Sequence, residues 1–384
     1  MKIGLLAVRT LNYGSLLQSY ATQEVLREMG HDVEIISYKK TNILKQGLRL
    51  LYPPMLERQI QVVYKKLYLN LIDKKLGEYF QCKERAMETF IDEHFISSEV
   101  YVGRKNLIEK SKKYDVFVLG SDQVWNPLNY GADYFSMSWV PDEIPKITYA
   151  ASFGVSDLPK YQRKKTRRDI QRIQFVSVRE KSASELIYKM TGRRVPVVAD
   201  PTILIDRTCW DKIKGEKIIE GKYIMCYFLG DNPNHRETAR RLSEALKLPI
   251  VTLPHGDEIV KSDFGFGNVI PEGVGPSEFI NLISNAQYVC TDSFHGTVFS
   301  ILYHKQFITF KRYTENVNGK ESTNSRLTSL LSLLELKNRL FDSSKGLDTK
   351  MFDEIDFSIP DLKLRDLREK SYSFLAGVLD SIIK

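Results

Sequence analysis

Short apolar runs alternate with helix-like segments from the start of the chain. Residues Lys2 to Val8 form a nearly continuous apolar run, of the kind that a buried parallel strand carries. Residues Ser15 to Met29 repeat apolar side chains at the period of an amphipathic helix, and Val33 to Ser37 are again mostly apolar. The pattern therefore predicts a strand, a helix and a second strand, in this order.

Both ends of the first predicted helix carry sequence signals. Ser15 and Gln18 have the spacing of a capping box at its start. Gly30 follows the last turn, where a glycine commonly ends a helix. The polar turn from Arg9 to Gly14 is therefore expected to join the first strand to this helix.

The alternation resumes near residue 115 and is repeated in the second half of the chain. Strands are predicted at 115–119, 146–150, 175–178, 195–198, 223–228, 250–253, 288–291 and 307–310. Helices are predicted at 236–246, 277–286, 294–302, 324–334 and 362–383. This pattern predicts an α/β protein with two Rossmann-like domains that face each other across a cleft. We place the N-terminal domain at 1–205, the C-terminal domain at 206–345 and a helical segment at 346–384.

One region interrupts the alternation. Residues 39–85 carry eleven Lys or Arg against four Asp or Glu, interleaved with Leu, Ile, Tyr and Val. We interpret them as part of a helical insertion at about 39–110 with a basic face. Such a face suits either simple exposure to solvent or contact with an anionic membrane leaflet, and the sequence leaves both open.

Composition narrows the possible partners and the location. The formal net charge of +8 favours anionic partners. The positive charge is concentrated in one insertion, and no nucleic-acid recognition motif accompanies it, so we expect no nucleic-acid partner. The four cysteines form no Cys-x-x-Cys pair, which argues against a zinc site or a disulfide framework. The short apolar N-terminus lacks a cleavage site, and no apolar stretch is long enough to span a bilayer. We therefore expect a cytoplasmic protein, with peripheral membrane contact as an option.

The segment from Thr291 to Phe299 is the most informative for chemistry. It joins an apolar strand to an apolar helix, and backbone N–H groups at such a start form an anion site beside Ser293, Gly296 and Thr297. His295 lies in the first helical turn, where an imidazole can exchange protons near neutral pH. The alternative is that Asp292 or Ser293 only caps the helix and His295 is an ordinary polar residue.

Polar residues also follow the other predicted strands. They are Asn12 and Tyr13 after the first strand, Asp122, Trp125 and Asn126 after the third, and Arg179 and Glu180 after the strand at 175–178. In the loop with Asp122, amides, a carboxylate and an indole together suit a sugar, and a Trp buried at the domain interface fits equally well. The loop with Asn12 could bind a phosphate or a sugar hydroxyl, although its spacing favours an ordinary turn. Arg179 either lines the cleft or pairs with Glu180. Lys311, Arg312 and Arg326 surround the loop after the last strand and suit a phosphate or carboxylate, or else solvent.

Seven segments together resemble the polysaccharide pyruvyl transferase family. They are NYGSLLQSYA at 12–21, YDVFVLGSDQVWNP at 114–127, YAASFG at 149–154, SVREKSA at 177–183, VVADPTILI at 197–205, VCTDSFHGTVFSI at 289–301 and NSRLTSLLSLLEL at 324–336. Each segment is modestly specific, but their order is highly specific. The resemblance implies a glycosyltransferase-B-like fold and a cytoplasmic enzyme of bacterial exopolysaccharide or capsule synthesis.

The resemblance also implies a reaction and a set of site residues. Phosphoenolpyruvate would be the donor, a sugar hydroxyl pair of a polysaccharide or its lipid-linked precursor the acceptor, and a pyruvate ketal the product, with no metal or other cofactor. The family's histidine falls on His295, and many members place Arg where this chain has Ser293. Arg326, Lys311 and Arg312 are then the candidates for the donor cation, beside Ser293, Gly296 and Thr297. The acceptor residues would be Asn12, Tyr13, Gln18, Asp122, Trp125, Asn126 and Arg179.

Two other functions stay open at this point. A sugar-nucleotide-dependent glycosyltransferase of the same fold would need a nucleobase and ribose pocket in the C-terminal half. A non-catalytic subunit of a polysaccharide-assembly complex would explain the departure at Ser293.

Overall fold

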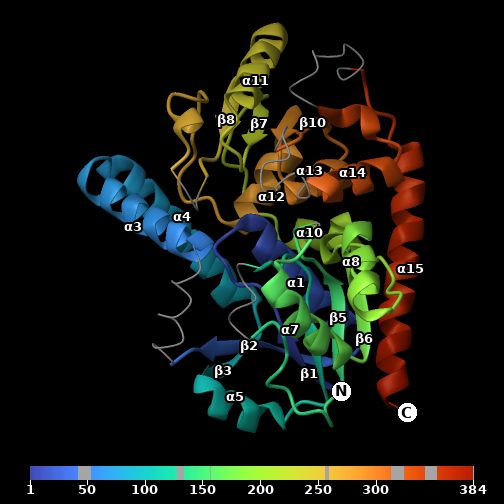
Figure 1. Cartoon of the computed structure of the whole chain (residues 1–384). Helices are drawn as coiled ribbons and strands as arrows, with labels where there is room; N and C mark the ends of the chain where they lie inside the picture. Colours follow the sequence, from blue (N-terminus) through green and yellow to red (C-terminus); the bar gives the residue numbers. More distant parts are fainter. Residues whose placement is uncertain are drawn as a thin grey trace.

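The computed structural model describes residues 1–41, 53–127, 134–155, 157–255, 259–312, 324–341 and 353–383. The molecule has two halves, each built on a parallel sheet with helices around it, and the C-terminal half lies above the N-terminal half in Figure 1. The first sheet uses residues before Arg179 and the second uses residues after Tyr223. Each half therefore has its own sheet, as the repeated alternation along the sequence predicts.

The N-terminal sheet has the strand order β3-β2-β1-β4-β5-β6. Its strands are β1 (Lys2–Leu6), β2 (Asp32–Lys39), β3 (Ser97–Val102), β4 (Val116–Leu119), β5 (Lys146–Ala151) and β6 (Phe175–Val178). All neighbouring pairs are parallel. This is the order of dinucleotide-binding Rossmann folds, and its direction of winding reverses between β1 and β4.

Helices cover both faces of this sheet and extend beyond it. They are α1 (Tyr13–Glu28), α3 (Pro53–Leu71), α4 (Lys74–His94), α5 (Gly103–Ser111), α7 (Lys160–Gln171), α8 (Lys181–Thr191), α9 (Pro201–Leu204) and α10 (Arg207–Ile213). Helices α3 and α4 form a hairpin that projects from the side of the molecule (Figure 1).

The C-terminal sheet has the order β11-β10-β9-β7-β8, again parallel throughout. Its strands are β7 (Ile224–Tyr227), β8 (Ile250–Thr252), β9 (Tyr288–Thr291), β10 (Gln306–Phe310) and β11 (Leu340–Phe341). The helices are α11 (Pro233–Leu246), α12 (Pro276–Asn285), α13 (Phe294–Leu302), α14 (Asn324–Leu333) and α15 (Ser358–Ile383). This is the flavodoxin-like strand order, and its winding reverses between β7 and β9. The predicted fold class of two Rossmann-like domains is therefore confirmed.

An apolar core continues from one half into the other. The ring of Tyr13 in α1 stacks on Phe279 in α12, with centroids 4.6 Å apart, and its hydroxyl donates to the carbonyl of Val274. Helix α15 runs along the side of both halves (Figure 1), and Ser371 Oγ accepts a hydrogen bond from the Ala199 amide. These contacts fix the carboxyl ends of the two sheets against each other.

Three local predictions differ from the structure. Asn12 caps α1, since its side chain accepts from the amides of Gly14 and Ser15, so the predicted capping box of Ser15 and Gln18 is wrong. The segment 39–110 is not helical throughout, because β3 pairs with the edge of β2. The predicted strand at 195–198 is reduced to a single bridge between Val197 and Val178.

Candidate active site

The points where the two sheets reverse their winding face the same cavity. Ligands of open α/β sheets bind at such points, beyond the carboxyl ends of the strands. The cavity has a volume of about 310 Å³. Its lining comes from both halves and consists of Val8, Thr10, Asn12, Ser15, Asp122, Gln123 and Asn126, and of Leu229, His255, Ser293, Phe294, His295, Arg312 and Arg326.

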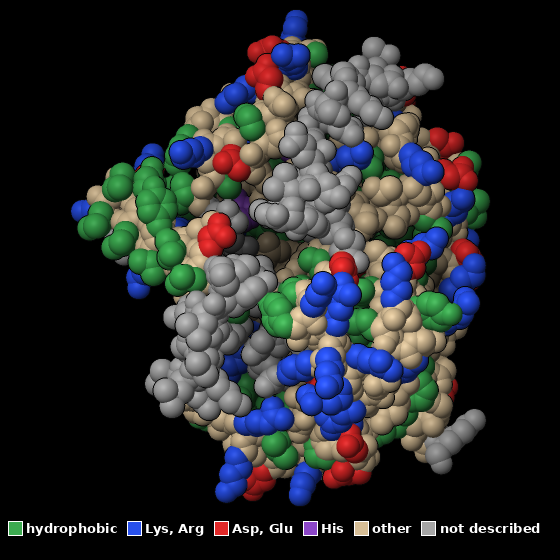
Figure 2. All heavy atoms as spheres, viewed as in Figure 1, with side chains coloured by type: hydrophobic (Ala, Val, Ile, Leu, Met, Phe, Trp, Pro, Cys, Tyr) green, Lys and Arg blue, Asp and Glu red, His purple; other side chains and the backbone are tan. Residues whose placement is uncertain are grey.

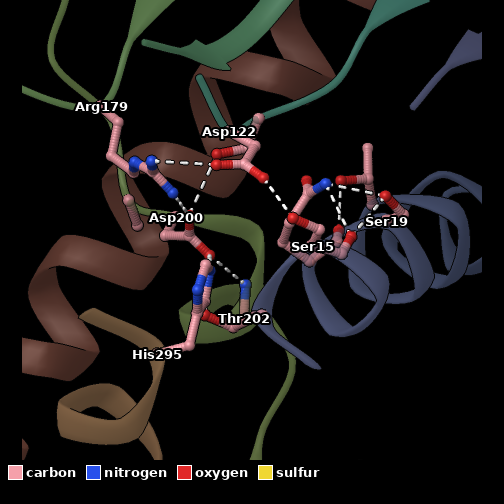
Figure 3. A network of polar contacts seen from close by, with 12 residues as sticks. Ser15, Ser19, Asp122, Arg179, Asp200, Thr202 and His295 are labelled. Atoms are coloured by element: carbon pink, nitrogen blue, oxygen red, sulfur yellow. Dashed lines mark hydrogen bonds and ion pairs between the residues drawn. The ribbon is translucent and has the colours of Figure 1, made fainter. Parts of the chain in front are cut away.

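A buried ion-pair network lies on the N-terminal side of this cavity (Figure 3). The guanidinium of Arg179 lies 2.5 Å from Asp200 and 3.8 Å from Asp122. Ser15 Oγ in α1 donates to Asp122 Oδ2 over 2.7 Å. Burial raises the pKa of Asp122, but the charges of Arg179 and His295 and the Ser15 hydrogen bond outweigh it and hold the pKa below its usual value. Both carboxylates are therefore anionic near neutral pH.

Asp200 connects this network to the histidine. It caps α9 and accepts hydrogen bonds from the amide and hydroxyl of Thr202 and from Ser121 Oγ. Its Oδ1 lies 3.7 Å from His295 Nε2 (Figure 3). Burial raises the pKa of Asp200, but Arg179 and His295 together lower it well below the usual range. A fixed negative charge therefore faces the imidazole ring of His295.

The imidazole of His295 is held between the two halves. His295 stands in the first turn of α13, which Ser293 caps by accepting from the Gly296 amide. On its other side the ring packs directly on Gly14 of α1, where a β-carbon would overlap the imidazole. The backbone of α1 and the carboxylate of Asp200 therefore fix the position of this ring.

Two further arginines reach the cavity from the C-terminal half with part of their hydrogen-bonding capacity unused. Arg326 of α14 is buried and forms no ion pair with any described residue, and its Nε has no hydrogen-bond partner among them. Burial, and then the charge of Arg179, lower the pKa of Arg326 to about 10, so its charge is under-compensated. Arg312 donates from Nη2 to the carbonyl of Asp292, while its Nε is also without a partner in the described part of the chain. An anion in the cavity would supply what both side chains lack.

A second buried network supports the loops of the C-terminal half. Asp292 accepts hydrogen bonds from the amides of Leu229 and Gly230, which ties the end of β9 to the end of β7. Arg312 lies 3.7 Å from this carboxylate and His235 lies 3.9 Å from it. Burial lowers the pKa of His235 to about 4, although Asp292 raises it, so this ring is neutral near pH 7.

Comparison with known proteins decides the family. A model of the polysaccharide pyruvyl transferase family matches residues 12–312. The chain belongs to this family. No curated protein sequence matches the chain.

Several solved structures are similar to this pyruvyl transferase family member, all at low sequence identity. The UDP-GlcNAc 2-epimerase from Methanocaldococcus jannaschii is 14% identical, with 97% of this chain and 100% of that chain covered and a TM-score of 0.45. The glycosyltransferase SnogD from Streptomyces nogalater is 10% identical, with coverages of 100% and 99% and a TM-score of 0.45. MurG from Acinetobacter baumannii is 9% identical, with coverages of 99% and 99% and a TM-score of 0.43.

The structure brings many of the residues predicted from the sequence to the cavity of this pyruvyl transferase family member. From the predicted donor set, Ser293, Arg312 and Arg326 line it together with His295, and from the predicted acceptor set Asn12, Asp122 and Asn126 line it. Arg179 lies behind this surface and pairs with Asp200, while Glu180 accepts from Ser152 and not from Arg179.

The other predicted residues do not line the cavity. Trp125 is 1% exposed and packs against Phe153, and Tyr13 is buried at the domain interface. Gln18 is buried within α1, where it donates to the Ser15 carbonyl and Ser19 Oγ. Gly296 packs on Thr291, and Thr297 shares a hydrogen bond with Thr309. Lys311 follows β10, and its amide donates to the Phe341 carbonyl.

Sequence reasoning missed several residues of the site. The sequence does not single out Asp200, and it predicts Ser15 only as part of a helix capping box. Gly14, Phe294 and His255 were not singled out. The signal for Asp200 and Gly14 is their place in the segments VVADPTILI and NYGSLLQSYA, which carry the family resemblance.

The described residues contain neither a metal-binding cluster nor a membrane-spanning helix. No group of three or more His, Cys, Asp and Glu side chains in these ranges is arranged to hold a metal ion. None of the helices within them combines the length and the apolar character needed to cross a bilayer.

Proposed function

We propose that this protein transfers the enolpyruvyl group of phosphoenolpyruvate to a pair of sugar hydroxyls and forms a pyruvate ketal. The main support is that Arg312 and Arg326 line the same cavity as His295, and that Arg326 forms no ion pair with any described residue. Phosphoenolpyruvate carries a phosphate and a carboxylate, and planar guanidinium groups bind both kinds of anion through paired hydrogen bonds. These two arginines would replace the arginine that many family members carry at the position of Ser293.

His295 is proposed to deliver the first proton. An acid must protonate the methylene carbon of the donor, which makes its second carbon electrophilic. A sugar hydroxyl then forms a bond to that carbon, phosphate leaves by breaking the carbon–oxygen bond, and the second hydroxyl closes the ketal. Of the two hydroxyl protons, one restores His295 and the other leaves with inorganic phosphate. General acid catalysis of this kind contributes about 10²–10⁴-fold to the rate.

The N-terminal half would hold the acceptor. Asn12, Asp122 and Asn126 line the cavity with amide and carboxylate groups, which bind sugar hydroxyls as donors and acceptors. Asp122 is anionic and therefore accepts a hydrogen bond from a hydroxyl group. Arg179 would act through Asp122 and Asp200 as a positioning residue, since it lies behind them. The acceptor is proposed to be part of a surface polysaccharide or its lipid-linked precursor.

Calorimetric titration of the purified protein with phosphoenolpyruvate tests the donor assignment. We expect micromolar binding, competed by inorganic phosphate and weakened about 10–100-fold in Arg326→Ala, since hydrogen bonds to charged groups contribute roughly 1.5–3 kcal/mol. Arg241→Ala is the matched control, because Arg241 is exposed on α11 and pairs with Glu237. Binding of a nucleotide sugar in place of phosphoenolpyruvate, with and without a glycan acceptor, would contradict the proposal and favour a glycosyltransferase.

A further inference from the structure

The outer face of helix α3 is apolar and exposed. Leu56, Ile60, Val63, Tyr64, Leu67 and Leu71 are between 45% and 73% exposed. At 3.6 residues per turn these six positions fall within one stripe along the helix. Such a continuous apolar surface usually marks an interaction site.

The opposite face of α3 already has its packing partner. Leu69 is buried against Tyr79 and Phe80 of α4, and Lys65 Nζ lies 4.8 Å from the centroid of the Phe80 ring. Helix α4 in turn joins the hairpin to the body, since Met87 and Phe90 belong to the main core. The hairpin is therefore anchored through α4, while the described residues leave the outer stripe of α3 uncovered.

A basic surface lies on the same side of the molecule. Helix α7 carries six Lys or Arg residues and a single acidic residue, Asp169, in twelve positions. Lys181 and Lys189 of α8 add further exposed cations. In Figure 2 the apolar side chains of α3 and the Lys and Arg side chains over α7 and α8 face the viewer together.

We infer that this protein docks on an anionic membrane surface, with the outer stripe of α3 inserted into the interface and α7 and α8 facing the lipid headgroups. Amphipathic helices lie in the plane of a membrane with the apolar face inward, and their binding strengthens with the apolar area that they bury and with electrostatic attraction to anionic lipids. The hairpin projects from the body, so its stripe can meet a flat surface without a clash (Figure 1). The inference does not depend on the reaction proposed above.

Charge favours a lipid surface over a second copy of this chain. The chain has a formal net charge of +8, and a second copy docked on the same face would bring two basic surfaces together. An anionic leaflet instead attracts each Lys or Arg that approaches it. Lys66 on α3 and Lys74 and Lys75 at the start of α4 add positive charge to the same hairpin.

Vesicle flotation of the full-length protein tests the inference. Two vesicle types are needed: phosphatidylcholine alone, and phosphatidylcholine with phosphatidylglycerol. We expect the wild type to float with the anionic vesicles, and to float less at high salt because the attraction is screened. Ile60→Glu with Leu67→Glu should weaken binding at least about tenfold, because two inserted apolar side chains become charged. Lys164→Glu with Arg167→Glu should weaken binding to the anionic vesicles about tenfold or more.

A matched control separates this surface from general effects of added charge. Leu246→Glu with Leu362→Glu changes two leucines that are 44% and 61% exposed, on α11 and α15, and should float like the wild type. The inference is overturned if the wild type stays with the lipid-free fraction, or if the α3 variant floats like the control. It is also overturned if the wild type sediments as a dimer without lipid and the α3 variant as a monomer, since the stripe would then join two copies.

Discussion

Each side of the cavity has a buried arginine, but only the arginine on the N-terminal side forms ion pairs with carboxylates among the described residues. On the N-terminal side, Arg179 lies between Asp122 and Asp200 and forms an ion pair with each. On the C-terminal side, Arg326 is as deeply buried but has no ion pair with any described residue. The pKa values of the two arginines differ for this reason. Burial lowers the pKa of Arg179, but Asp200 and Asp122 outweigh it and raise this pKa above its usual value. Burial lowers the pKa of Arg326 to about 10.

This difference separates structural charges from binding charges. On the N-terminal side, the ion pairs of Arg179 with Asp122 and Asp200 hold together the loop after β4, the loop after β6 and the segment before α9. Breaking such buried ion pairs is costly. A buried cation without an ion-pair partner is costly to the fold, and an anionic ligand can compensate for that cost. Each prediction below tests whether the two sides of the cavity differ in this way.

The largest effect is expected where the two sides touch. In Gly14→Ala the added methyl group would overlap the His295 imidazole and displace it from Asp200. We expect turnover, measured as phosphate release with acceptor present, to fall by about 10²–10⁴-fold, as for loss of a general acid. Phosphoenolpyruvate affinity should change much less, because Arg312 and Arg326 remain in place.

Gly377→Ala is the control for this substitution. Gly377 lies within α15 and has open space around its missing β-carbon. Full turnover by the Gly14→Ala variant, with the imidazole signal of His295 unshifted in nuclear magnetic resonance spectra, would contradict the assigned role of this contact.

The next prediction compares the two arginines in the fold. Arg179→Met leaves Asp122 and Asp200 buried without their cation, so we expect a loss of about 3–5 kcal/mol in the free energy of unfolding. Arg326→Met removes a buried cation that has no ion-pair partner among the described residues, so the free energy of unfolding should stay unchanged or rise. Urea denaturation followed by fluorescence measures both. Equal losses in the two variants would remove the distinction between the two sides of the cavity.

The two sides should also respond to acid at different pH. The pKa of His235 is about 4 in the folded protein and about 6.5 when unfolded, so the unfolded chain binds the proton first as pH falls. The stabilisation from neutral His235 is therefore complete above about pH 6.5 and is lost as pH falls toward 4. Asp122 and Asp200 have lowered pKa values, so their contribution is lost only below about pH 4.

His235→Gln isolates the first of these two steps. The glutamine does not titrate, so the stability advantage of the wild type over this variant should shrink between pH 7 and pH 4.5. Thermal unfolding across this pH range measures the difference. A constant difference would mean that His235 does not titrate in this window.

The sequence predicted the framework of the site better than its contacts. The bounds of β9 and α13 agree with those predicted, because an apolar strand, a polar turn and an apolar helix follow one another directly. Strand β3 was missed, because Ser97–Val102 is a short edge strand in which only Ser98 and Tyr101 are buried, inside the predicted helical insertion. Edge strands carry a weak apolar pattern, since only one neighbour covers them.

The side-chain partners depend on tertiary contacts that no local pattern contains. Asp122, Arg179 and Asp200 come from three separate loops and meet only because β4 and β6 end on the same edge of the sheet. Trp125 follows the same strand as Asp122 but turns inward onto Phe153. A polar loop in the sequence therefore predicted the location of the site, and the structure was needed to separate cavity residues from core residues.

The smallest expected effect comes from Ser15, whose hydroxyl donates to Asp122 at the cavity surface. Ser15→Ala removes this hydrogen bond, which should cost about 1 kcal/mol of unfolding free energy, and Ser19→Ala, which loses the bond to the Val8 carbonyl, is the control with a similar cost. Phosphoenolpyruvate affinity should be unchanged in both variants, because the proposed donor residues come from the C-terminal half. If calorimetry instead finds that Ser15→Ala weakens phosphoenolpyruvate binding as much as Arg326→Ala does, the donor contacts both sides of the cavity. The division into a structural N-terminal side and a donor-binding C-terminal side would then be wrong.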